Sequence, residues 1–189
     1  MIAQATAAGY LNADEIAQTL HRGLAGRFTG ERVLVLIPDH TRTIPLPQLF
    51  RLVVENLHDA QQLDFMVALG THPALSPAQL RQLVGITAEE QATAFRHVGL
   101  LNHAWDTDDA LVQIGILPQE QIQALAGDKW HHSLSGEVPV RINRRIFEYD
   151  HVLILGPTFP HEVVGFSGGA KYLLPGISGP EMINVSHWL

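Results

Sequence analysis

The sequence predicts an α/β fold in which a parallel, Rossmann-like sheet is flanked by helices. The first sign is the run RVLVLI at 32–37, which is apolar without alternation, as strands buried on both faces are. The second is that such runs end in polar turns, and the third is that apolar residues at helical spacing follow those turns. Strand, turn and helix in repeated order are typical of a parallel sheet with crossover helices.

The composition fits one globular domain. The chain has 189 residues, of which 46% are apolar and 16% are charged, enough to bury a core. A net charge of −7 without any basic tract argues against nucleic acid or an anionic membrane as a partner. Because there is no cysteine, disulfides and thiolate chemistry are excluded. The N-terminus does not resemble a signal peptide and no apolar run exceeds strand length, so we expect a cytoplasmic protein without a membrane span.

The N-terminal half alternates predicted helices and strands. Asn12 and Glu15 form a capping-box pattern at the start of a helix that extends to Leu24. The strand at 32–37 follows, and helical spacing resumes at 49–60. The remaining elements of this half are a strand at 64–69, a helix that begins at Ser76 and Pro77, and a short helix from a second capping box at 87–90.

The C-terminal half is less regular. Residues 127–138 are polar and indicate a loop, and Pro180 with Glu181 opens a helix that carries His187. The other expected elements are strands at 95–101, 138–142 and 151–155 and helices at 106–116 and 118–126.

Three polar turns follow predicted strands of the sheet. They are Asp39–Arg42, Gly70–His72 and Pro157–His161. Ligands of open α/β sheets bind beyond the carboxyl ends of the strands. We therefore expect these turns to meet at one edge of the sheet and to form the site.

The stretch from Pro160 to His187 is rich in glycine and carries reactive side chains. Glycines are costly on folding and suit places where backbone approaches a ligand closely. The stretch is not a Walker A loop, because Ala170 precedes Lys171 and Tyr172 follows it where Ser or Thr is needed. A phosphate cradle of another kind and a plain tight turn both stay open, and Lys171 is either a ligand-binding amine or a solvated surface group.

The histidines also allow two interpretations. His72 and His161 are either polar turn residues or a pair of acid/base groups that work near neutral pH. His187 is either a helix-end histidine or a metal ligand, and Arg42 beside Asp39 is either an ion pair or an anion clamp. Six further histidines have no motif around them and are interpreted as ordinary: His21, His58, His97, His103, His131 and His132.

In combination, these motifs resemble the lactate racemase family from about Arg32 to the end of the chain. The motifs are DHTR at 39–42, GTH at 70–72, and PH at 160–161 followed by GFSGGAK at 165–171 and then His187. The family carries a nickel-pincer nucleotide, the mononucleotide of nickel pyridinium-3,5-bisthiocarboxylic acid. The resemblance implies that Lys171 holds this cofactor through a thioamide bond and that His187 is a nickel ligand.

The resemblance also implies an isomerase that racemises or epimerises small 2-hydroxy acids such as lactate. His72 and His161 would flank the substrate carbon as the catalytic acid/base pair while hydride moves from carbon to the cofactor. One turn would bind the cofactor or orient the substrate; its residues are Asp39, His40, Thr41 and Arg42. One departure is that Pro73 and Ala74 follow the Gly-Thr-His motif, where the family usually has arginine.

Enzymes of this family are longer and have a second domain. The resemblance therefore predicts that 1–189 is a single α/β domain, the N-terminal, cofactor-bearing one, and that a C-terminal domain is missing as a partner. By itself this domain is expected to be inactive. Whether the protein forms a homo-oligomer stays an open question. Three other functions remain as alternatives: a non-catalytic mononucleotide- or phosphate-binding module, a histidine-based metallohydrolase, and a purely structural α/β domain.

Overall fold

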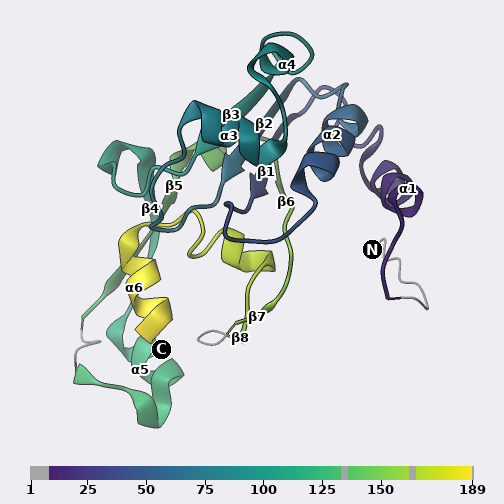
Figure 1. Ribbon diagram of the computed structural model, residues 1–189. Coiled ribbons are helices and arrows are strands. Elements are labelled where there is room, and N and C mark those ends of the chain that lie inside the picture. Colours follow the sequence, from purple (N-terminus) through teal and green to yellow (C-terminus); the bar gives the residue numbers. More distant parts are fainter. Residues whose placement is uncertain (1–8, 133–135, 162–164, 189) are drawn as a thin grey trace.

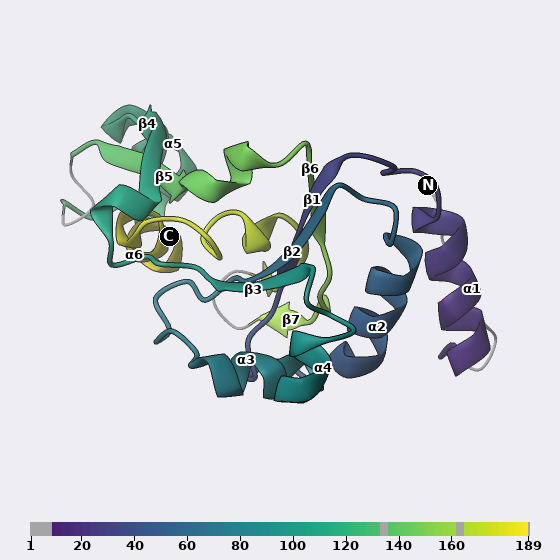
Figure 2. The same cartoon turned by 90° about the horizontal axis from the view of Figure 1, so that it is seen from above.

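A four-stranded parallel sheet lies at the centre of the protein. The computed structural model describes residues 9–132, 136–161 and 165–188. The strands stand in the order β3-β2-β1-β6 (Figures 1 and 2), and all three pairings are parallel. Their bounds are β1 Arg32–Ile37, β2 Gln62–Val67, β3 Val98–Asn102 and β6 His151–Ile154. The predicted α/β fold is thereby confirmed.

Helices cover one face of this sheet. They are α1 (Ala13–Leu24), α2 (Leu46–Asn56), α3 (Pro77–Val84) and α4 (Ala88–Ala92). Helices α2 and α3 lie against the strands, and α1 lies outside α2 (Figure 2). Side chains of β1 that point to this face, such as Val33 and Val35, pack with Phe50 and Val53 of α2. Apolar burial of this kind is the main stabilising term of the fold.

The opposite face is covered by an antiparallel ribbon and by the C-terminal segment (Figure 2). Leu34 and Leu36 of β1 point to this face and pack with Ile142, Tyr172 and Ile177. The elements here are β4 (Leu111–Leu117), α5 (Gln119–Ala126), β5 (Val138–Asn143), the 3-10 helices η2 (Gly127–Lys129), η4 (Arg144–Glu148) and η5 (Gly169–Tyr172), and α6 (Pro180–Trp188). No helix among the described residues is both long and apolar enough to cross a membrane.

One predicted helix is wrong. Within 106–116 the helical part is the short 3-10 helix η1 (Asp108–Ala110), and the residues from Leu111 onward belong to strand β4. The segment is rich in β-branched residues and contains Gly115, both unfavourable in a helix. Its partner β5 lies more than twenty residues further along the chain, so a local pattern could not reveal the pairing. The predicted loop at 127–138 contains η2, and 133–135 lie outside the described residues.

The strand order places a topological switch point beside β1. The chain passes from β1 to β2 to β3 in one direction, and β6 then pairs with the other edge of β1. The connection after β1 and the segment after β6 therefore run to opposite sides of the sheet and open a crevice at the carboxyl ends of these strands. The three predicted polar turns all follow strands that border this crevice.

Candidate active site

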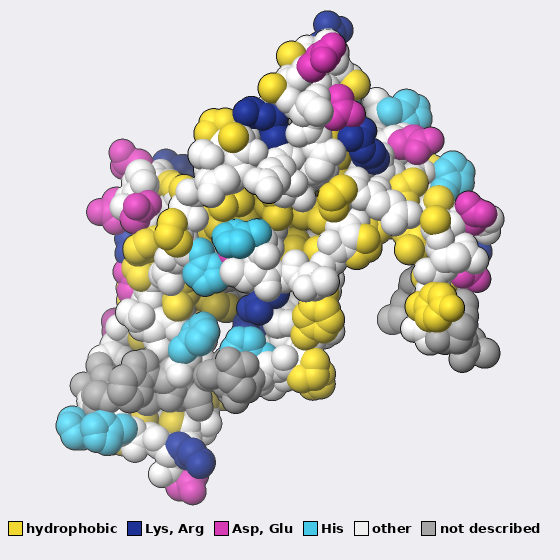
Figure 3. Space-filling view, viewed as in Figure 1, with side chains coloured by type: hydrophobic (Ala, Val, Ile, Leu, Met, Phe, Trp, Pro, Cys, Tyr) yellow, Lys and Arg dark blue, Asp and Glu magenta, His cyan; other side chains and the backbone are white. Residues whose placement is uncertain are grey.

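One cavity of about 190 Å³ lies at the carboxyl ends of β1, β2 and β6. Figure 3 shows histidine side chains around a hollow on this face, with a basic side chain inside it. Most of the predicted site residues line this cavity: Asp39, Thr41, Arg42, His72, His161, Lys171 and His187. His40 does not; it lines a neighbouring cavity between the 39–44 turn and α3.

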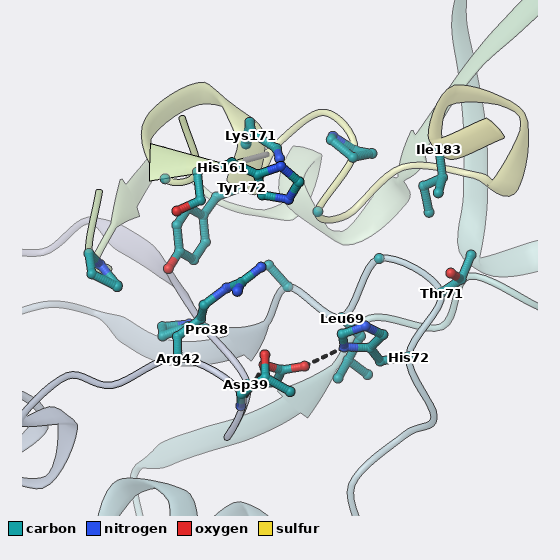
Figure 4. Close-up of a pocket in the computed structure, with 18 of the residues that line it drawn as sticks. Pro38, Asp39, Arg42, Leu69, Thr71, His72, His161, Lys171, Tyr172 and Ile183 are labelled. Atoms are coloured by element: carbon teal, nitrogen blue, oxygen red, sulfur yellow. Dashed lines mark hydrogen bonds and ion pairs between the residues drawn. The ribbon is translucent and has the colours of Figure 1, made fainter. Parts of the chain in front are cut away.

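Asp39 and His72 form a hydrogen-bonded pair (Figure 4). Asp39 directly follows Pro38 at the end of β1 and is buried, whereas His72 is exposed on the turn after β2. The His72 Nδ1 atom lies 2.5 Å from Asp39 Oδ2. With the carboxyl ionised, Nδ1 carries the proton and donates it, which leaves Nε2 as the basic atom directed away from Asp39.

Hydrogen bonds keep Asp39 ionised despite its burial. Burial raises the pKa of this carboxyl, but the hydrogen bonds from Thr41 and His72 outweigh that effect and hold the pKa below its usual range. Thr41 donates to Oδ1 from its backbone N–H at 3.0 Å and from its hydroxyl at 2.5 Å. Asp39 is thus a fixed acceptor that orients the His72 ring.

Backbone contacts fix the turn that carries His72. The His72 N–H donates to the Leu69 carbonyl at 2.9 Å, and the Gly70 N–H donates to the Gly176 carbonyl at 2.8 Å. Trp105, from the segment after β3, donates its indole N–H to the His72 carbonyl at 3.2 Å. The turn is therefore held by the glycine-rich segment on one side and by Trp105 on the other.

His161 lies in a short hairpin on the opposite wall of the cavity. Strand β7 (Pro160–His161) pairs with β8 (Gly165–Phe166), and 162–164 lie outside the described residues. The buried Ser167 closes the hairpin, because its hydroxyl contacts both the Phe159 N–H (3.2 Å) and the Phe159 carbonyl (3.3 Å). In Figure 4, His161 and Lys171 lie across the cavity from His72.

The glycines around Lys171 allow the chain to turn tightly. Gly168 has φ +87°, and a Cβ atom there would lie 2.4 Å from the Pro157 carbonyl oxygen. A Cβ at Gly176 would lie 2.5 Å from the Tyr172 carbonyl oxygen. Close approach of backbone segments therefore explains these two glycines, and the tight turn places Lys171 of η5 in the wall of the cavity.

His187 reaches the cavity from the last turn of α6. Its Nδ1 lies 2.9 Å from the Ile183 carbonyl oxygen, which can only accept, so Nδ1 carries the proton. Nε2 is then the atom available to a metal ion. The ring centroids of His187 and His161 are 6.4 Å apart.

The described residues contain no group of three or more His, Asp or Glu side chains that could hold a metal ion. His187 presents an imidazole and Lys171 an amine to the same cavity. This donor set suits a metal that arrives with most of its ligands already in a cofactor. The residues present therefore fit a metal-bearing cofactor attached through an amine.

Comparison with known proteins identifies the family. Residues 17–124 and 132–189 match the family model described as the lactate racemase N-terminal domain. The chain belongs to this family. The predicted resemblance is thereby confirmed, and the site described above is the strand-end cavity of a lactate racemase N-terminal domain.

Two curated relatives are lactate racemases. The protein from Lactiplantibacillus plantarum is 27% identical over 159 residues, which cover 82% of this chain and 32% of the relative. The protein from Thermoanaerobacterium thermosaccharolyticum is 24% identical over 162 residues, covering 83% of this chain and 32% of the relative. The chain thus spans about a third of the length of these relatives.

Two solved structures share the fold. A crystal structure of a Thermotoga maritima protein superposes with a TM-score of 0.82 at 28% identity, covering 94% of this chain and 41% of that chain. The lactate racemase apoprotein from Thermoanaerobacterium thermosaccharolyticum gives a TM-score of 0.61 at 23% identity, covering 88% of this chain and 34% of that chain. The second likeness shows the fold alone.

Tyr172 and Ile183 also line the cavity and were not predicted as site residues. For Tyr172 the signal was its position directly after Lys171, but the side-chain direction on a 3-10 turn cannot be read from the sequence. Ile183 could have been found one helical turn before His187, since residues four apart share a face of a helix.

Proposed function

We propose that this chain is the cofactor-bearing domain of a racemase or epimerase that acts on small 2-hydroxy acids such as lactate. The observation that carries the proposal is that one cavity collects an amine and three imidazoles. These are Lys171, His187, His72 and His161, and the chain belongs to the lactate racemase N-terminal domain family.

In this proposal the chain holds a nickel-pincer nucleotide. Lys171 would hold it covalently, and His187 would be a nitrogen ligand of the nickel through Nε2, since Nδ1 faces the Ile183 carbonyl. When bound, the cofactor would supply an acceptor for the hydrogen on the substrate's C2. Thr41 and Arg42 line the same cavity beside Asp39 and are placed to contact the cofactor or the substrate.

His72 and His161 are proposed as the two acid/base groups. For one enantiomer, His72 Nε2 accepts the proton of the substrate hydroxyl, while Asp39 stabilises the resulting charge at Nδ1. For the other enantiomer, His161 accepts the hydroxyl proton. Their placement on opposite walls of the cavity supports the proposal, because a racemase must work on both faces of a planar intermediate (Figure 4).

Racemisation by the full-length protein, loaded with the nickel-pincer nucleotide, tests this function. L-Lactate is supplied and D-lactate is measured by chiral chromatography. We expect His72→Ala and His161→Ala each to lower the rate by at least about 100-fold, the usual range for an acid/base group, with nickel content unchanged. His97→Ala is the control, because His97 is exposed and precedes β3 at the opposite edge of the sheet. Full activity in both site variants would contradict the roles.

A further inference from the structure

Tyr172 presents an unpaired hydroxyl to the cavity. Its side chain packs with Leu34 and Leu36 of β1 and is only 8% exposed. Among the described residues the Tyr172 hydroxyl has no hydrogen-bond partner. It is not one of the fully buried polar atoms without a partner, and Tyr172 lines the cavity. The packing fixes the ring, and the hydroxyl is left for a ligand.

Gly156, just beyond β6, makes room for this hydroxyl. A Cβ atom at Gly156 would lie 1.8 Å from the Tyr172 hydroxyl oxygen and 2.3 Å from the ring carbon that bears it. Any side chain at 156 would therefore displace the ring. Gly156 thus allows the position of the Tyr172 ring, which explains a glycine whose backbone angles do not require one.

The nearest charged groups are Arg42 and Asp39, and of the two Arg42 can attract an anion. Burial raises the pKa of Tyr172 to about 12, with Arg42 lowering it and Asp39 raising it further, so the hydroxyl is a donor at neutral pH. Arg42 does not pair with Asp39, whose carboxylate is taken by Thr41 and His72. Within the described part of the chain, the Arg42 guanidinium makes no ion pair. Figure 4 shows the Tyr172 hydroxyl directed toward Pro38 and Arg42.

We infer that the Tyr172 hydroxyl and the Arg42 guanidinium together bind an anionic oxygen of the ligand. This inference rests on the proposed function, which supplies two such groups: the carboxylate of the 2-hydroxy acid and the phosphate of the nucleotide. A guanidinium and a phenolic hydroxyl are both donors that favour either anion. Tyr172 is in this account a binding residue, and Gly156 positions it.

Binding to the cofactor-free chain tests the inference. Lactate carries only the carboxylate and ribose 5-phosphate only the phosphate, and each is titrated into the protein while backbone chemical shifts are followed by NMR. Tyr172→Phe removes one hydroxyl and keeps the packed ring. We expect it to weaken one of the two anions by about tenfold or more, as loss of a hydrogen bond to a charged group does. The anion that is weakened identifies the source.

Two controls make the outcome decisive. Tyr10→Phe removes a hydroxyl from a side chain that is 74% exposed beside α1 and should change neither affinity. The unfolding midpoint of Tyr172→Phe should stay close to that of the wild type, which excludes a general loss of structure. Equal affinities in wild type and Tyr172→Phe, or no binding of either anion by the wild type, would overturn the inference. Racemisation by the full-length protein loaded with nickel-pincer nucleotide tests the proposed function separately.

Discussion

At the scale of single residues, Asp39 decides how the site is arranged. The sequence left open whether Asp39 forms an ion pair with Arg42. In the structure the Asp39 carboxylate accepts hydrogen bonds from Thr41 and His72 instead. This choice has two consequences. The His72 ring is fixed with Nε2 as its basic atom, and the guanidinium of Arg42 is left for a ligand.

Replacing Asp39 tests the first consequence directly. In the wild type, ¹⁵N chemical shifts of the His72 ring should report a proton on Nδ1, because Asp39 accepts it at 2.5 Å. Asp39→Asn can present its NH₂ group to the ring and thereby favour the other tautomer. We expect the variant to shift the ring toward a proton on Nε2. An unchanged tautomer in Asp39→Asn would show that Asp39 does not orient His72.

His103 makes stability depend on pH. It is buried at the end of β3, where Nε2 donates to the Ser178 carbonyl at 2.9 Å and Nδ1 accepts from the Asn143 amide at 3.0 Å. Burial lowers its pKa, and the hydrogen bond to Ser178 offsets this only in part. The folded protein therefore keeps His103 neutral at a pH where the unfolded chain, with a pKa of about 6.5, is protonated.

The sign of the pH effect follows from proton binding. Below about pH 6.5 the unfolded state binds the extra proton, so the free energy of unfolding falls as the pH falls, by at most about 1.4 kcal/mol per pH unit from this group. Urea unfolding between pH 5 and 8 measures the slope. His103→Gln should give a shallower slope than the wild type, since the other histidines titrate in both. Parallel curves would contradict the assignment.

At the scale of elements, Arg141 of β5 anchors the helix that carries His187. Its guanidinium pairs with Glu181 in the first turn of α6 and with Asp108 of η1, the latter at 3.0 Å. The Gly179 N–H also donates to the Arg141 carbonyl at 3.0 Å. The antiparallel ribbon that the sequence did not predict therefore holds α6, and with it His187 and Ile183, against the cavity.

Removing this anchor should loosen α6. We expect Arg141→Ala to lower the free energy of unfolding by about 1 kcal/mol, since the pair with Glu181 is only partly exposed, and to speed hydrogen exchange of the α6 amides. Arg145→Ala is the matched control, because Arg145 and its partner Glu148 lie 3.8 Å apart and are more than half exposed. Equal exchange of α6 in both variants would mean that Arg141 does not hold the helix.

The same elements show how far the sequence could predict the fold. Continuous apolar runs predicted β1 and β6, capping boxes predicted α1 and α4, and Ser76 with Pro77 predicted α3, because these signals are local. β4 was missed because its stability comes from distant β5. The site turns were found for a general reason: parallel strands end at one edge. The pairing of Asp39 and the direction of Tyr172 depend on side-chain packing, which no local pattern encodes.

At the scale of the whole molecule, one topological feature assembles the site. The switch point beside β1 brings turns from three strands together, and the segment after β6 supplies η5 and α6 to complete the wall. The cofactor proposed for this cavity is an extension of the family membership of the chain. The chain spans about a third of the length of its curated relatives, so the activity of a whole racemase is a proposal built on this domain.

Intact-mass spectrometry of the protein loaded with nickel-pincer nucleotide tests whether Lys171 holds the cofactor covalently. The chain contains two lysines, Lys129 and Lys171, so the attachment site can be assigned with two variants. We expect one covalent adduct of the nucleotide in the wild type and in Lys129→Ala, and none in Lys171→Ala. A wild-type mass without an adduct, or an adduct that persists in Lys171→Ala, would contradict covalent attachment at Lys171.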